Sequence, residues 1–282
     1  MNKTTIQSAT IADTPGSFAR INLLTVIAIA ICSYLLGTII HEVLGHGLAA
    51  LILGLHPTRV TSVDLEVSFT GADPWRARAV DAAGCAGNLV GALIAMGLLR
   101  TLRHANTNAR YFLWLLATIN LFIVGGYLVF PTLLGFGDWI SFTKGLEPLA
   151  LWRIGLIVLG CGVLILALWW SVRAIDPFLG QGVRNRHRRA NQLATIAYLA
   201  GSIISTLAGM FNPTSPQLIL ISAAAASFGG TCFLVFLNVF IGKSSPATPA
   251  TPLTPTRSLP WLVLGAFALL VYFVVLGPGL PR

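Results

Sequence analysis

Charge is scarce in this sequence. Of its 282 residues only 10% are Asp, Glu, Lys or Arg, whereas 55% are hydrophobic. Such a composition cannot cover the surface of a water-soluble protein of this size, and the mean hydropathy of +0.80 indicates an integral membrane protein. The formal net charge of +9 does not indicate a nucleic-acid partner, because the Lys and Arg residues lie between apolar runs, where they contact anionic lipid headgroups.

Cysteine is also rare. Cys32, Cys85, Cys161 and Cys232 each lie alone inside an apolar run. Disulfide frameworks and thiolate zinc sites need paired cysteines, which this spacing does not provide. We therefore expect the four thiols to be small core residues.

Long apolar runs dominate the chain instead. They predict an all-α polytopic membrane protein with about seven transmembrane helices. We also expect a mobile N-terminal segment at 1–17 and a Ser/Thr/Pro-rich linker at 243–260 that cannot bury a core. The expected spans are residues 20–54, 82–99, 111–137, 154–172, 193–211, 217–242 and 261–276.

Glycines mark two of these spans. In the second, Gly84, Gly87 and Gly91 lie around Asn88, so another helix backbone can approach closely and the Asn amide is available for a hydrogen bond. In the third, Gly125 and Pro131 weaken the helix ahead of an acid at position 138.

A period-two pattern separates the first two spans. Within residues 58–70, polar positions alternate with apolar ones, which is typical of a half-buried strand. We expect a short β segment here, whose edge an extended substrate could pair with. The alternative is an ordinary hairpin packed on the membrane surface. The apolar positions are Val63, Leu65, Val67 and Phe69.

The most unusual stretch is 41–47, which follows the uncharged run 21–40. It contains His41, Glu42 and His46. Charged side chains cost about 2.5 to 3.5 kcal/mol each at the centre of a membrane, so these groups need partners, and a metal ion satisfies all three. The stretch resembles the His-Glu-x-x-His signature of zinc proteases, in which two histidines bind the metal and the glutamate activates water.

The two histidines are five residues apart rather than four. At about 100° per residue a regular helix would turn them about 140° apart, whereas a π-type turn stacks positions five apart. Gly45 and Gly47 flank His46 and loosen the helix where that turn is needed. The same offset is similar to the His-Glu-Leu-Leu-Gly-His motif of the dipeptidyl-peptidase III family.

Three segments together resemble the site-2 protease family of intramembrane zinc metallopeptidases. Residues 45–50 are similar to its Gly-His-Ala-x-x-Ala helix, and residues 83–88 to its Gly-Pro-x-x-Asn helix without the proline. Asp138 falls where the family places the aspartate of its Leu-Asp-Gly motif. The resemblance covers a core at 18–153 with three transmembrane helices. The four further helices at 154–282 lie outside it.

The resemblance implies that His41, His46 and Asp138 coordinate Zn²⁺ and that Glu42 is the catalytic base. A helix cap is the alternative role for Asp138. Asn88 and Asn120 are candidates for stabilising the oxyanion of the reaction or for holding the metal ligands from behind. The alternative is that each amide only packs helices together. The expected function is hydrolysis of peptide bonds in or near transmembrane segments of other proteins, with water supplied by a cavity among the first three helices.

The alternative function is a non-catalytic membrane scaffold or receptor that keeps the protease fold. Loop charges address the orientation: with seven spans, two thirds of the 18 Lys and Arg residues lie on the N-terminal side. We therefore expect a bacterial cytoplasmic membrane with the N-terminus in the cytoplasm. Anionic headgroups are expected near Arg184, Arg186, Arg188 and Arg189.

Overall fold

The computed structural model describes residues 19–212, 219–242 and 251–281. The N-terminal segment expected at 1–17 and the first part of the expected linker lie outside them. Within the described residues, seven helices are long and apolar enough to cross a membrane, which confirms the all-α polytopic class. They are Leu23–Ile52, Pro74–Thr101, Thr107–Leu134, Leu149–Ala174, Arg184–Gly209, Ala223–Phe240 and Leu259–Leu276.

Several of these spans combine α-helical with π-helical turns. The first comprises α1 (Leu23–Ile39), the π-helical η1 (Ile40–Gly47) and α2 (Leu48–Ile52). The remaining helices are α3 (Pro74–Thr101), α4 (Thr107–Leu134), α5 (Asp138–Thr143), α6 (Leu149–Ala174), α7 (Asp176–Leu179), α8 (Val183–Ala190), η2 (Asn191–Thr195), α9 (Ile196–Gly209), η3 (Ile219–Gly229), α11 (Phe233–Phe240), α12 (Leu259–Leu270) and η4 (Val271–Leu276).

Polar caps set the ends of the helices that carry the site. Asp73 accepts a hydrogen bond from the Trp75 N–H and is followed by a proline at the first position of α3. The third span is not broken at Gly125: α4 continues through Pro131 and ends at Leu134, where the capping residue Gly135 has a left-handed φ of 82°. The helix thus ends four residues before Asp138.

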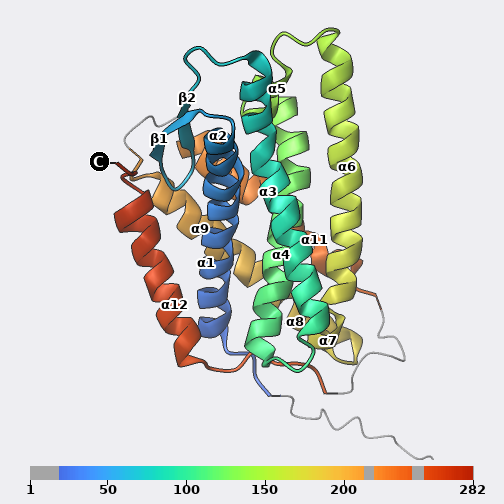
Figure 1. The fold of residues 1–282 in the computed structure, drawn as a ribbon. Helices are drawn as coiled ribbons and strands as arrows, with labels where there is room; N and C mark the ends of the chain where they lie inside the picture. The colour runs from blue at the N-terminus through green and yellow to red at the C-terminus, as the bar shows by residue number, and fades with distance from the viewer. Residues whose placement is uncertain (1–18, 213–218, 243–250, 282) are drawn as a thin grey trace, which may run out of the picture.

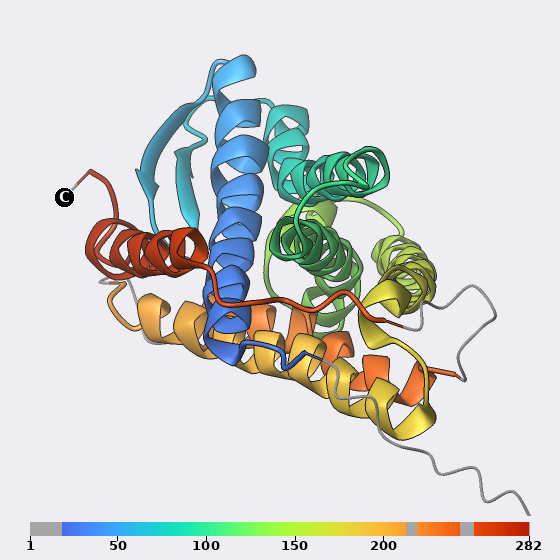
Figure 2. The same ribbon diagram turned by 90° about the horizontal axis from the view of Figure 1, so that it is seen from below.

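The first span is the central element of the bundle. It packs on α3, α4, α9 and α12, so helices from both halves of the chain surround it (Figures 1 and 2). A backbone contact of Asn22 with Pro255, and contacts of Asn108 with Thr256, hold the base of the bundle together. The described part of the expected linker is therefore packed against the helix ends.

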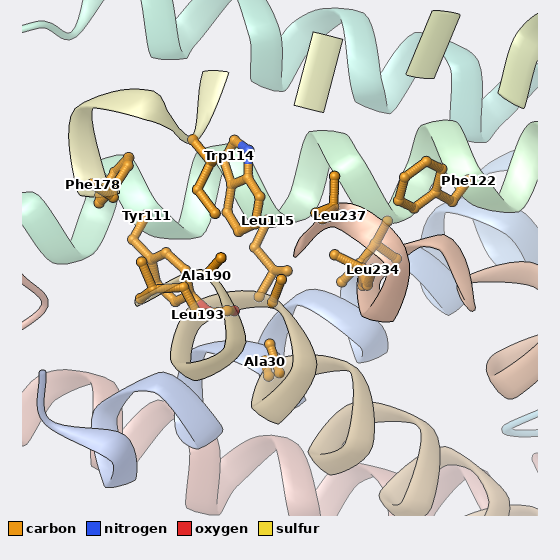
Figure 3. Packing of buried hydrophobic residues seen from close by; sticks show 14 of the residues in the cluster. Ala30, Tyr111, Trp114, Leu115, Phe122, Phe178, Ala190, Leu193, Leu234 and Leu237 are labelled. Atoms are coloured by element: carbon orange, nitrogen blue, oxygen red, sulfur yellow. The ribbon is translucent and has the colours of Figure 1, made fainter. Parts of the chain in front are cut away.

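The largest hydrophobic cluster joins residues from the first and last halves of the chain (Figure 3). Trp114 on α4 is fully buried in it, and its indole N–H donates to the Ser171 carbonyl on α6. The Tyr111 hydroxyl donates to the Leu193 carbonyl of η2. Such large rings bury much apolar surface, and the two hydrogen bonds satisfy their polar atoms.

The segment at 58–70, expected as a strand or alternatively as a hairpin, lies in a hairpin. Strands β1 (His56–Val60) and β2 (Leu65–Ser68) pair antiparallel across a turn closed by the Thr61 N–H and the Asp64 carbonyl. Val60 exchanges both backbone hydrogen bonds with Leu280, so the C-terminal residues cover the outer edge of β1. The other edge of the hairpin, along β2, has no strand partner among the described residues.

The four arginines expected at lipid headgroups lie on helix α8 rather than in a loop. Arg184 and Arg188 are exposed. Arg186 is buried and donates to the carbonyls of Gly180 and Gly242 and to Asp176. Arg189 is also buried and donates to backbone carbonyls of Phe178 and Leu253. Two of the four guanidinium groups therefore bind protein, because loop carbonyls surround them.

Candidate metal centre

The π-helical turn predicted from the five-residue spacing is present. η1 contains both histidines, and their rings lie on one face with centroids 4.8 Å apart. His41 and His46 are 4% and 7% exposed. A side chain at Gly45 would place its Cβ 2.7 Å from the Gly84 Cα, so glycine at this position lets η1 and α3 touch backbone to backbone.

Asp138 completes a set of three donors. The turn after α4 uses Gly135 and Gly137, both at positive φ, to place Asp138 in the first turn of α5. Its Oδ2 is 3.3 Å from the Nε2 of His41 and 3.3 Å from the Nε2 of His46. Tetrahedral ligands about 2.0 to 2.1 Å from Zn²⁺ stand about 3.3 to 3.4 Å apart, so both spacings suit a shared ion.

The other nitrogen of each imidazole has a hydrogen-bond acceptor. Nδ1 of His41 is 2.5 Å from the Asn88 Oδ1, and Nδ1 of His46 is 2.7 Å from the Val80 carbonyl. An acceptor at Nδ1 keeps the proton there and leaves the Nε2 lone pair for a metal. One nitrogen of each histidine and one carboxylate oxygen of Asp138 lie within 4.8 Å of one another, so the three residues could hold a divalent cation.

The two asparagines considered for the oxyanion are held behind His41. Asn88 also donates to the Gly37 carbonyl and to the Asn120 Oδ1. Asn120 donates in turn to the Leu116 carbonyl. Both amides are fully buried and lie outside the cavity described below. Their role in this structure is therefore to orient the imidazole of His41.

Gly84 forms the floor of the site. A Cβ at this position would lie 2.6 Å from the His41 Nε2 and closer still to the His46 Nε2. No side chain can occupy that space without displacing the two donor atoms. The Gly-rich pattern of the second span, predicted to allow close helix packing, therefore also makes room for the imidazoles.

A cavity of about 180 Å³ opens beside the three donors. Glu42, which is 7% exposed, lines it next to the imidazoles. The apolar positions of the predicted strand segment face it too. Ala225, Ala226 and Gly230 form part of its wall, so the cavity is not enclosed by the first three helices alone. The strand-segment residues are Val63, Leu65, Val67 and Phe69.

Two carboxylates outside the spans show the local electrostatics. Burial favours the neutral form of Asp138, but the two imidazoles beside its Oδ2 outweigh this effect and hold its pKa well below the ordinary value. For Asp64, burial and the charge of Glu42 raise the pKa to about 7. Asp138 is thus ionised at neutral pH, as a metal ligand would have to be, whereas Asp64 is only partly charged.

Tyr127 was not singled out in the sequence. Its ring centroid lies 4.7 Å from that of His41, and it lines the same cavity. A tyrosine inside an apolar run carries no motif, so only the packing of α4 against η1 reveals it.

Comparison with protein-family models, curated proteins and solved structures finds no match for this chain.

We expect purified wild-type protein to contain about one divalent metal ion per chain by elemental mass spectrometry. His46→Ala and Asp138→Asn should lose it, because each removes one of three donors. Gly84→Ala should lose it as well, since the new Cβ strikes both Nε2 atoms. Gly97→Ala is the matched control on the same helix, where a Cβ meets open space. Metal-free wild type, or full metal content in Gly84→Ala, would contradict the site.

Proposed function

We propose that this chain is an intramembrane zinc metalloprotease. One observation supports it above the others: two imidazoles and a carboxylate converge beside Glu42 in a cavity within a bundle of apolar helices. A set of two histidines and one carboxylate is typical of catalytic zinc sites, which keep a fourth position open. Structural zinc sites are instead closed by four protein ligands.

The residues divide the chemistry between them. A bound Zn²⁺ would polarise the scissile carbonyl and activate water at neutral pH. Glu42 accepts the proton of the attacking water and returns it to the leaving amine. Glu42 lines the same cavity as the two imidazoles, which places the base beside the proposed metal position. Asn88 keeps His41 in the tautomer that this arrangement requires.

The free edge of β2 supports an extended substrate. The N–H and carbonyl of Val60 both bond Leu280 on one side of β1. Val60 and Leu65 on the other side therefore form a non-hydrogen-bonded pair, and the N–H and carbonyl of Leu65 point away from β1. Since strand residues alternate, the backbone groups of Leu65 and Val67 both point to the free edge. The Leu65 N–H already donates to the Glu42 carboxylate, so the N–H and carbonyl of Val67 are the β2 groups on this edge that a peptide could pair with. A peptide added along β2 would therefore pass directly beside Glu42.

The substrate that fits this location is a membrane-spanning segment of another protein, locally unwound so that it can add as a strand. Apolar side chains line the strand side of the cavity, namely Val63, Leu65, Val67 and Phe69. The exposed Arg184 and Arg188 at the opposite end of the bundle suit anionic lipid headgroups.

Replacement of Glu42 by Gln should abolish cleavage and leave the metal in place. The amide keeps the shape of the side chain but cannot take the proton of water. We would measure release of fluorescence from dye-quenched casein, an unfolded protein that offers extended segments, together with metal content. Loss of cleavage with metal retained supports the protease. Cleavage by Glu42→Gln, or none by metal-bound wild type, favours a scaffold or receptor.

Removal of a single backbone N–H on β2 tests whether substrate pairs with this strand edge. Val67→Pro removes the N–H that points to the free edge and leaves the Val67 carbonyl, so it should raise KM for casein roughly 10-fold with little change in kcat. Val67→Ala removes the side chain but keeps the N–H, and it measures the side-chain contribution separately. Equal KM values for the two variants would show that substrate does not pair along β2.

Orientation follows from the two ends of the bundle. The hairpin and α5 lie at the end opposite the N-terminus of α1 and helices α7 and α8 (Figure 1). We propose that the arginine-rich end faces the cytoplasm of a bacterial cell and the metal centre lies toward the exterior. Green fluorescent protein inserted at 243–250 should fluoresce, and alkaline phosphatase fused to the C-terminus should be active. The opposite pattern would reverse the topology.

A further inference from the structure

Peptide hydrolysis needs a hydrogen-bond donor where the carbonyl oxygen becomes negative. Asn88 and Asn120 do not supply it, because their amides are used behind His41. The acidic side chains that line the cavity, Glu42, Asp64 and Asp138 among them, accept hydrogen bonds when ionised. Among the described residues that line this cavity, Tyr127 has the one hydroxyl group, and both histidine Nδ1 atoms already have acceptors.

The hydroxyl of Tyr127 is available. It makes no hydrogen bond with another described residue, and it is not among the polar atoms sealed away without a partner. The residue lines both the main cavity and a smaller one that also contacts Glu42. A hydroxyl donor that opens into the cavity without a protein partner can donate to a ligand bound there.

The position of the ring is fixed from two sides. The ring packs against that of His41, with the two ring planes tilted by 51°. On α4 the preceding residue, Gly126, is so close to Gly230 that a Cβ would lie 2.7 Å from the Gly230 Cα. This contact holds α4 against the segment that follows η3. The tyrosine is therefore positioned by backbone packing rather than by its own hydrogen bonds.

We propose that Tyr127 is a catalytic residue that donates a hydrogen bond to the oxyanion, an inference that rests on the proposed protease function. As the bond between water oxygen and carbonyl carbon forms, the carbonyl π electrons move to its oxygen, which accepts the hydrogen bond from Tyr127. The water proton goes to Glu42. When the C–N bond breaks, those electrons restore a carbonyl, and Glu42 gives its proton to the amine. Tyr127 keeps its own proton throughout.

The test compares Tyr127→Phe with wild type, because phenylalanine keeps the ring contact with His41 and removes only the donor. We expect unchanged metal content and KM for dye-quenched casein, and a kcat lowered about 100-fold or more. Tyr198→Phe, in α9 away from the cavity, is the matched control and should keep the wild-type kcat.

A binding measurement separates this role from mere structure. A phosphinic peptide carries tetrahedral anionic oxygens like the oxyanion, and Tyr127→Phe should bind it about 10-fold more weakly. An isosteric peptide with a methylene group instead of phosphinate should bind both proteins equally. Equal phosphinate affinity and kcat in wild type and Tyr127→Phe would overturn the role of Tyr127. If Glu42→Gln loses cleavage in the same assay, the protease function stands even so.

Discussion

The contact between η1 and α3 is the constraint on which the site depends. At Gly45 and Gly87 the two backbones touch, and a Cβ at either position would enter the neighbouring chain. Only this separation brings Asn88 and the Val80 carbonyl within hydrogen-bond distance of the imidazoles. The helices approach closely because the residues at the contact are glycines, which have no side chains. Small residues of this kind let helices associate in a membrane without a hydrophobic driving force.

The second half of the chain completes what the first half begins. The three candidate ligands come from η1 and α5, yet the cavity wall includes residues of η3 and its following turn. A chain of hydroxyl contacts continues inward from there: Tyr34 on α1 bonds Thr231 and Ser202, and Tyr272 on η4 bonds Ser205. The later helices therefore bury polar groups beside the site as well as apolar ones beneath it.

The sequence predicts those features for which a residue type permits few backbone geometries. Histidines five apart can share a face only in a π turn, so the spacing predicted η1. Glycine clusters predicted the close helix crossing. The placement of Asp138 came from a resemblance and could not come from periodicity, because the Gly135–Gly137 turn decides where it lies.

The remaining features depend on tertiary packing. Alternation at 58–70 identified the face that lines the cavity but not the turn at Thr61 that divides it into two strands. Four arginines close in sequence gave no indication that Arg186 and Arg189 would meet buried carbonyls while their neighbours stay exposed. Tyr127 had no pattern at all, since its interest arises from a ring 86 residues earlier in the chain.

Because Leu280 pairs with β1, a further strand can join the small sheet along β2. A guest strand has one side to join, and its side chains then alternate between the cavity and the opposite face. Selectivity would be exercised at every second residue of the guest, while the intervening positions are free to vary. Sequences cleaved at such a site would share a rhythm of residue types more than a contiguous motif.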